Sequence, residues 1–136
     1  MGKFMIIEQD LKKIFQKLDH DQVLHLQLNE NELGIKVFDG ASKIFLTTRV
    51  YKGDNFIPKS VRNGIARKAP WSRASIKTFL SVNENQYHVD LNYLGLLQQM
   101  NAQSFALLME DFASLAYGWR VYLDEQDQND LIHVRV

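Results

Sequence analysis

The order of hydrophobic periodicities along the chain is the feature that most constrains its fold. Apolar residues first recur at a helical spacing, then alternate with polar residues in three successive segments, and a short basic segment follows. Two further alternating segments and a long helical apolar stripe come next. Because sequential strands joined by short turns pair antiparallel, this order predicts an α+β fold with an antiparallel sheet of about five strands. The predicted elements run α-β-β-β-α-β-β-α: helix 8–18, strands 24–28, 33–38 and 43–51, helix 58–69, strands 75–81 and 87–92, and helix 102–124, followed by a short C-terminal strand at 131–136.

Turn and cap residues support these boundaries. Asp39-Gly40 is typical of a tight hairpin turn between two strands. Pro58 suits the first turn of a helix, where its missing N–H group is not needed, and Pro70 ends that helix. Asn101 has a short polar side chain that can accept a hydrogen bond from the free N–H groups at a helix start. The last helix carries apolar residues at steps of three and four, which we interpret as core with one flank available to a partner: Phe105, Leu108, Phe112, Leu115, Trp119 and Tyr122.

Length and composition exclude several classes of protein. A chain of 136 residues is the size of one domain, so we expect a single domain over 1–136. The absence of cysteine excludes disulfides, thiolate zinc sites, iron–sulfur clusters and thiol nucleophiles. No segment approaches the roughly 18 consecutive apolar residues of a membrane span, and residues 1–7 are too short for a signal peptide. We therefore expect a cytoplasmic protein.

The charges sum to zero but are unevenly distributed. Residues 43–77 hold nine basic side chains against the single acid Asp54, whereas acids predominate in 84–136. A basic segment near an aromatic residue, here Trp71, can bind phosphates and stack a base. It can also bind an acidic protein surface, or be the solvated face of a helix that docks on the sheet. The basic patch consists of Lys59, Arg62, Arg67, Lys68 and Arg73.

No pattern indicates a catalytic, cofactor or metal site. The sequence contains no nucleophile elbow, phosphate-binding loop or dinucleotide fingerprint. His25, His88 and His133 lie on predicted strands and would form a metal site with Asp90 only if those strands were neighbours; otherwise they face solvent. We assign no catalytic residue, no cofactor and no metal ligand. A binding or assembly protein is therefore favoured over an enzyme.

The order of the elements resembles that of the type III secretion chaperones and of the sensory-transduction-regulator-like proteins with the same fold. The resemblance covers roughly residues 5–124 and includes the closing helix SFALLMEDFASLAYGWRVYLDE, which is similar to the alternating apolar and acidic last helix of those chaperones. It implies a homodimer that holds an extended segment of a secreted effector protein by strand addition and side-chain pockets, without nucleotide hydrolysis. The neutral charge and basic middle of this chain depart from the acidic character of such chaperones.

This resemblance, together with the alternation of the strands, suggests two surfaces. The candidate partner-binding residues are Leu24, Leu26, Phe38, Phe45 and Phe79, and the candidate dimer surface comprises Ile57, Val61, Ile65 and Trp71.

The alternative function is a small nucleic-acid-binding or regulatory protein that uses the basic region 43–77. Salt separates this hypothesis from the chaperone hypothesis, because phosphate binding weakens steeply with salt and apolar groove binding does not.

Overall fold

The computed structural model confirms the α+β class and the predicted order of elements. It describes the backbone of residues 2–28, 31–67 and 76–135, and the side chains of 9–27, 31–67 and 76–128. The elements are α1 (Gly2–Gln16), β1 (Gln22–Leu28), β2 (Asn31–Phe38), β3 (Lys43–Lys52), α2 (Lys59–Ile65), β4 (Thr78–Asn83), β5 (His88–Leu96), the 3-10 turn η1 (Leu97–Gln99) and α3 (Ala102–Arg135).

All neighbouring strands of the five-stranded sheet are antiparallel, in the order β1-β2-β3-β5-β4. The first three strands form the predicted meander. The chain then passes through α2 and returns with the β4–β5 hairpin, which joins the sheet through β5 against β3. This topology leaves β1 and β4 as the two edges of the sheet.

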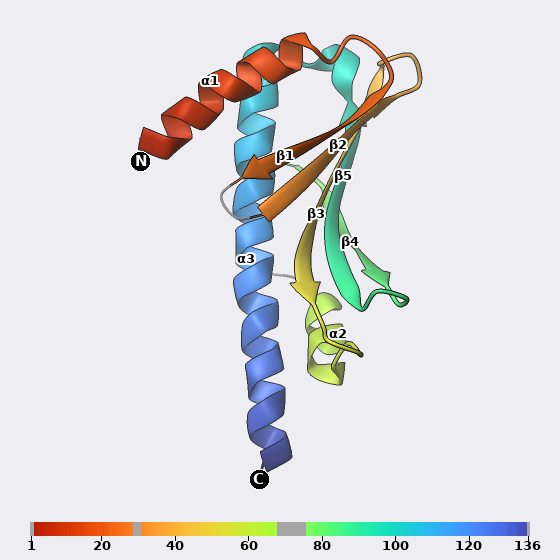
Figure 1. The fold of residues 1–136 in the computed structure, drawn as a ribbon, viewed down its shortest axis with the longest axis vertical. Coiled ribbons are helices and arrows are strands. Elements are labelled where there is room, and N and C mark those ends of the chain that lie inside the picture. Colours follow the sequence, from red (N-terminus) through yellow and green to blue (C-terminus); the bar gives the residue numbers. More distant parts are fainter. Residues whose placement is uncertain (1, 29–30, 68–75, 136) are drawn as a thin grey trace.

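Strand alternation divides the sheet into two faces, because successive side chains of a strand point to opposite sides. The inner face carries the core. Its central row places Ile35 opposite Leu46, and both side chains are buried. Helix α3 packs against β3, and α1 and α2 each pack against α3. Figure 1 shows α3 running the length of the molecule, with α1 crossing near its N-terminal part and α2 beside its C-terminal half.

The N-terminus of α3 has the predicted cap. The Ser104 N–H donates to Asn101 Oδ1 at 2.8 Å, and the Asn101 N–H donates in return to Ser104 Oγ at 2.9 Å. These bonds satisfy polar groups that a helix start leaves unpaired.

Among the described residues, none of the helices combines the length and the hydrophobicity that a membrane span requires.

The predicted C-terminal strand at 131–136 is wrong. Helix α3 continues to Arg135, so it has 34 residues and is about 51 Å long at about 1.5 Å per residue. The polar segment 125–130 contains neither glycine nor proline, so nothing ends the helix there. The alternation of Leu131 to Val134 could only form a strand beside another strand, and the helix instead carries these residues away from the sheet (Figure 1).

Several other boundaries differ from the prediction. Helix α1 begins at Gly2 rather than at residue 8, and β4 covers Thr78–Asn83 rather than 75–81. Helix α2 ends at Ile65 rather than at residue 69. The apolar connection at 93–100, for which the sequence allows an extended stretch or a short helical turn, contains both: β5 extends to Leu96, and η1 follows it. Strand β5 is long because its pairing with β3 continues to the Lys43–Leu96 pair, and the Leu97 N–H then donates to the Ser42 carbonyl oxygen at 2.8 Å.

Candidate partner-binding surface

The outer face of the sheet, opposite the helices, exposes a set of apolar side chains. Phe45 of β3 lies in register with Leu94 of β5, and its ring centroid is 6.4 Å from that of Phe79 on β4. Leu94 is 55 % exposed and Phe79 is 50 % exposed. We call this set the outer apolar patch: Val23, Phe38, Phe45, Phe79, Leu94 and Leu96.

An exposed apolar patch of this kind marks an interaction surface more often than a bare region of a monomer. The patch draws on all five strands, so it lies across the sheet rather than in a narrow cleft. Lys36, opposite Phe45 in the register, places its ammonium group 5.6 Å from the ring centroid of Phe38. The surface is therefore apolar with basic groups among the rings, and it can hold apolar side chains of another chain.

The five candidate partner-binding residues divide between the two faces. Phe38, Phe45 and Phe79 come together on the outer face. Leu24 and Leu26 are in register with Ile35 and Leu33, so they face the helices and pack half-buried against the core. The structure thus brings three of the candidates into one surface and separates the two leucines from it.

Sequence reasoning missed Val23, Leu94 and Leu96. Val23 is 60 % exposed and directly precedes Leu24, the first residue of the predicted strand, so the predicted strand range does not include it. Leu94 and Leu96 fell in a segment interpreted as a connection. A strand assignment extended to residue 96 would have placed both on the face of Phe45.

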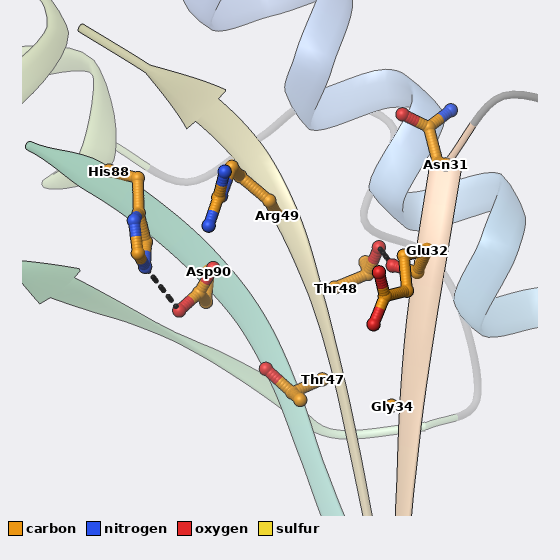
Figure 2. Close-up of a pocket in the computed structure, with 8 residues that line it drawn as sticks. All are labelled: Asn31, Glu32, Gly34, Thr47, Thr48, Arg49, His88 and Asp90. Carbon is orange, nitrogen blue, oxygen red and sulfur yellow. Dashed lines mark hydrogen bonds and ion pairs between the residues drawn. The ribbon is translucent and has the colours of Figure 1, made fainter. Parts of the chain in front are cut away.

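A polar cavity of about 390 Å³ lies two positions along β3 from Phe45, because Thr47 is one of its lining residues. Figure 2 shows the residues that line it. Thr47 Oγ1 donates to Asn92 Oδ1 at 2.7 Å, and Asn92 Nδ2 donates to Ser81 Oγ at 2.9 Å, so these polar groups are satisfied within the sheet. The cavity is lined by Asn31, Glu32, Gly34, Thr47, Thr48, Arg49, His88 and Asp90.

Helix α3 holds the strand that carries Arg49 from the inner side. Arg120 Nε donates to the Arg49 carbonyl oxygen at 3.0 Å, and Arg120 Nη2 donates to Thr48 Oγ1 at 2.8 Å. Thr48 Oγ1 in turn donates to the Glu32 carbonyl oxygen at 2.8 Å. Burial lowers the pKa of Arg120, because desolvation disfavours its charged form. The backbone at Arg49 is thereby fixed to both α3 and β2.

The histidines do not form the suggested metal site. His25 Nδ1 lies 2.8 Å from Glu32 Oε1, and the buried His88 places Nε2 3.2 Å from Asp90 Oδ2. His133 belongs to α3 rather than to a strand, so the premise that three histidines share a sheet is wrong. Among the residues whose placement is described, no group of three or more possible ligands could hold a metal ion.

The candidate dimer surface is largely used within the chain. Ile57 is 4 % exposed and Val61 is 0 % exposed, and both belong to the core. Gly64 lets α2 approach α3 closely, because a Cβ atom at this position would lie 3.1 Å from Tyr122 Cε2. Ile65 is half-buried and keeps some open surface, while Trp71 lies outside the described residues. The predicted dimer surface therefore stays a prediction, with Ile65 as its accessible member.

The basic patch is only partly available for a ligand. Arg62 forms a bidentate ion pair with Glu84, with N–O distances of 2.7 and 3.0 Å, and donates through Nε to the Ile57 carbonyl oxygen at 3.2 Å. The pair raises the pKa of Arg62 and lowers the pKa of Glu84, chiefly through these hydrogen bonds. Lys59 and Arg67 are exposed. Lys68 and Arg73 lie outside the described residues, so the nucleic-acid alternative stays a prediction.

Comparison with known proteins finds similarity in structure only. No protein-family model and no curated protein sequence matches the chain. A chain in the crystal structure of the ExsC–ExsE complex matches with a TM-score of 0.62 at 15 % identity, covering 88 % of this chain and 95 % of that one.

Two further structures show the same likeness. A chain of the heterodimeric ExoU–SpcU complex from the type III secretion system of Pseudomonas aeruginosa has a TM-score of 0.56 at 14 % identity, covering 78 % of this chain and 86 % of that one. A chain of the HopA1–SchA chaperone–effector complex has a TM-score of 0.53 at 10 % identity, covering 88 % and 97 %. Similarity over most of both chains at such low identity is similarity of fold. The chain therefore has a type III secretion chaperone-like fold.

Proposed function

We propose that this protein is a non-enzymatic cytoplasmic chaperone or adaptor that binds an extended segment of a partner protein, a secreted effector, and that it acts as a homodimer. The observation that carries the proposal is the outer apolar patch, which spans all five strands on the face away from the helices. The fold, shared with proteins solved in chaperone–effector and type III secretion complexes, supports it.

The geometry of the patch suits an extended segment better than a small molecule. Its apolar side chains are spread across the open face of the sheet, so a ligand must be long to reach several of them. Strand edges β1 and β4 also present backbone N–H and C=O groups that an added strand can pair with. Side-chain contacts on the face and main-chain hydrogen bonds at an edge can therefore act on one bound chain.

The first test replaces Phe45 with glutamate at the centre of the outer apolar patch. A charge placed against apolar side chains of the partner would be desolvated without a counter-ion, so we expect recovery of the partner from a native-host lysate to fall by about 30-fold or more, the loss typical of a central interface residue. Tyr117→Glu is the matched control, because Tyr117 is 68 % exposed but lies on α3. Quantitative mass spectrometry of affinity-purified samples measures both variants.

Equal recovery by wild type and Phe45→Glu would contradict the proposal, provided that both variants melt like wild type. Loss with Tyr117→Glu and retention with Phe45→Glu would move the binding surface to α3. A partner recovered in this way is then mapped by limited proteolysis of the complex, and the protected segment should be free of stable structure when isolated.

The homodimer is tested by light scattering. At high micromolar concentration we expect a mass of twice 15.8 kDa. Ile65→Lys should shift the equilibrium toward the monomer by about tenfold or more, because it places a charge on the accessible part of the predicted interface. Arg67→Glu, a charge change at an exposed neighbouring site, should leave the mass unchanged. A monomeric mass for the wild-type chain at this concentration would refute the dimer.

A further inference from the structure

The charged groups around the outer face are unequally engaged. Three carboxylates each have a basic partner: Asp39 Oδ2 lies 3.1 Å from Lys43 Nζ, Glu32 pairs with His25, and Asp90 pairs with His88. Arg49, by contrast, has no acidic partner within the described residues. No hydrogen bond or ion pair there engages its guanidinium, although Asp90 is its register partner on β5. The side chain of Arg49 is exposed.

The cavity beside Arg49 has room for a side chain of another molecule. Figure 2 shows Arg49 extending from β3 toward the side of β5 that carries His88 and Asp90. Gly34 contributes no side chain to the cavity wall, and Thr47 contributes a small one, so about 390 Å³ remains open. The Arg49 backbone is held by Arg120 from the other side of the sheet, which keeps the base of the side chain in place.

A guanidinium offers five N–H donors in a planar fork, and a carboxylate matches this fork with two parallel hydrogen bonds. The carboxylates of Glu32 and Asp90 already contact imidazole nitrogens, so Arg49 is the charged group in the described cavity wall with unused donors. A lysine or arginine from a ligand would meet Arg49 as a like charge. The unpaired guanidinium can therefore bind an acidic ligand side chain on its own side of the cavity, whereas the carboxylates of Glu32 and Asp90 disfavour an acid that lies close to them.

We propose that this cavity is a carboxylate subsite of the partner-binding surface, in which Arg49 binds an aspartate or glutamate of the bound segment. The proposal rests on the proposed function. It also gives a spacing. Arg49 is four positions from Phe45 on β3, about 13 Å at about 3.3 Å per residue, and both side chains point to the same face because the count is even. An extended segment running along β3 would thus carry its acid four residues from the apolar side chain that covers Phe45.

The test uses a library of fluorescent 15-residue peptides in which apolar residues vary at alternate positions. One position, four residues from a central apolar residue, is fixed as Glu, Gln or Lys. Binding to the wild-type chain is measured by anisotropy at one salt concentration. We expect the best-binding Glu peptides to bind about tenfold or more tightly than their Lys counterparts, with Gln intermediate, as for one charged hydrogen-bonded pair. Arg49→Glu should reverse this order, and Arg49→Gln should remove it.

Arg67→Glu is the matched control, since it makes the same charge change at an exposed residue outside the cavity and should keep the preference for Glu. Apolar peptides that bind equally well with Glu, Gln or Lys would overturn the carboxylate subsite and leave the chaperone function standing. A preference for Glu that survives Arg49→Glu would also overturn it. Failure of every peptide to bind, with Phe45→Glu having no effect on partner recovery, would refute the proposed function and the subsite with it.

Discussion

Replacing Phe112 with alanine is expected to lower the free energy of unfolding by about 3–5 kcal/mol. The Phe112 side chain is 0 % exposed and lies in the middle of the apolar stripe of α3, between Phe105 and Trp119. Removing the ring leaves a cavity that α3 cannot close, because the helix is held by α1, α2 and β3 at once. The loss then includes both the transfer free energy of the ring and the cavity term. Urea denaturation followed by circular dichroism measures it.

Two comparisons make this measurement specific to the core. Leu107→Ala removes an apolar side chain from the same helix, but Leu107 is 54 % exposed, so its substitution should cost a small fraction of the Phe112 value. Phe112→Leu keeps most of the volume and should fall between them. Near-wild-type stability for Phe112→Ala would mean that the stripe is not the centre of the core, and would remove the basis for placing the partner on the opposite face.

Gly53→Ala is expected to destabilise the fold by about 1–3 kcal/mol, as overpacking at a confined site does. A Cβ atom at Gly53 would clash with the backbone oxygen of Phe56, so the loop between β3 and α2 would have to move. That loop is tied to the β4–β5 turn, because the Gly53 N–H donates to the Tyr87 carbonyl oxygen at 2.7 Å. Moving it would disturb both α2 and the hairpin.

The same denaturation experiment tests this substitution. Asn55→Ala is the control, because Asn55 lies in the same loop and is exposed. It should change stability by less than about 0.5 kcal/mol, as surface substitutions usually do. Equal stability of Gly53→Ala and Asn55→Ala would show that the loop adapts freely and that its path does not position α2.

The sequence was sufficient for the order of elements because each one has a strong local signal. The alternation of Ile44, Leu46 and Thr48 with Phe45 and Thr47 separates two faces of β3, and the fold buries the first of these sets. The cap at Asn101 was also predictable, because a short polar side chain before an apolar helical stripe interacts only with its own helix start. Signals of this kind depend on residues a few positions apart, and the neighbours in sequence are also neighbours in space.

The binding surface was only half predictable. Phe38, Phe45 and Phe79 were identified from alternation, but their union with Val23, Leu94 and Leu96 depends on which strands pair and in what register. By alternation alone, Leu24 and Leu26 of β1 are indistinguishable from these phenylalanines. The register sets Leu24 against Ile35 and so turns it toward the helices. The surplus donors of Arg49 were invisible for the same reason, because its register partner Asp90 is engaged by His88.

Local pattern thus determined the type and order of the helices and strands, since propensity, capping and periodicity act over one or two turns of chain. The folded chain determined the extent of α3, the burial of Ile57 and Val61, and the pairing of each charged group. Those properties arise from contacts between segments far apart in sequence, where burial and register choose among local patterns that look alike. The apolar face of α2 is an example. Its sequence pattern is compatible with a partner surface, but the protein buries this face in its own core, because Gly64 allows α3 to approach closely.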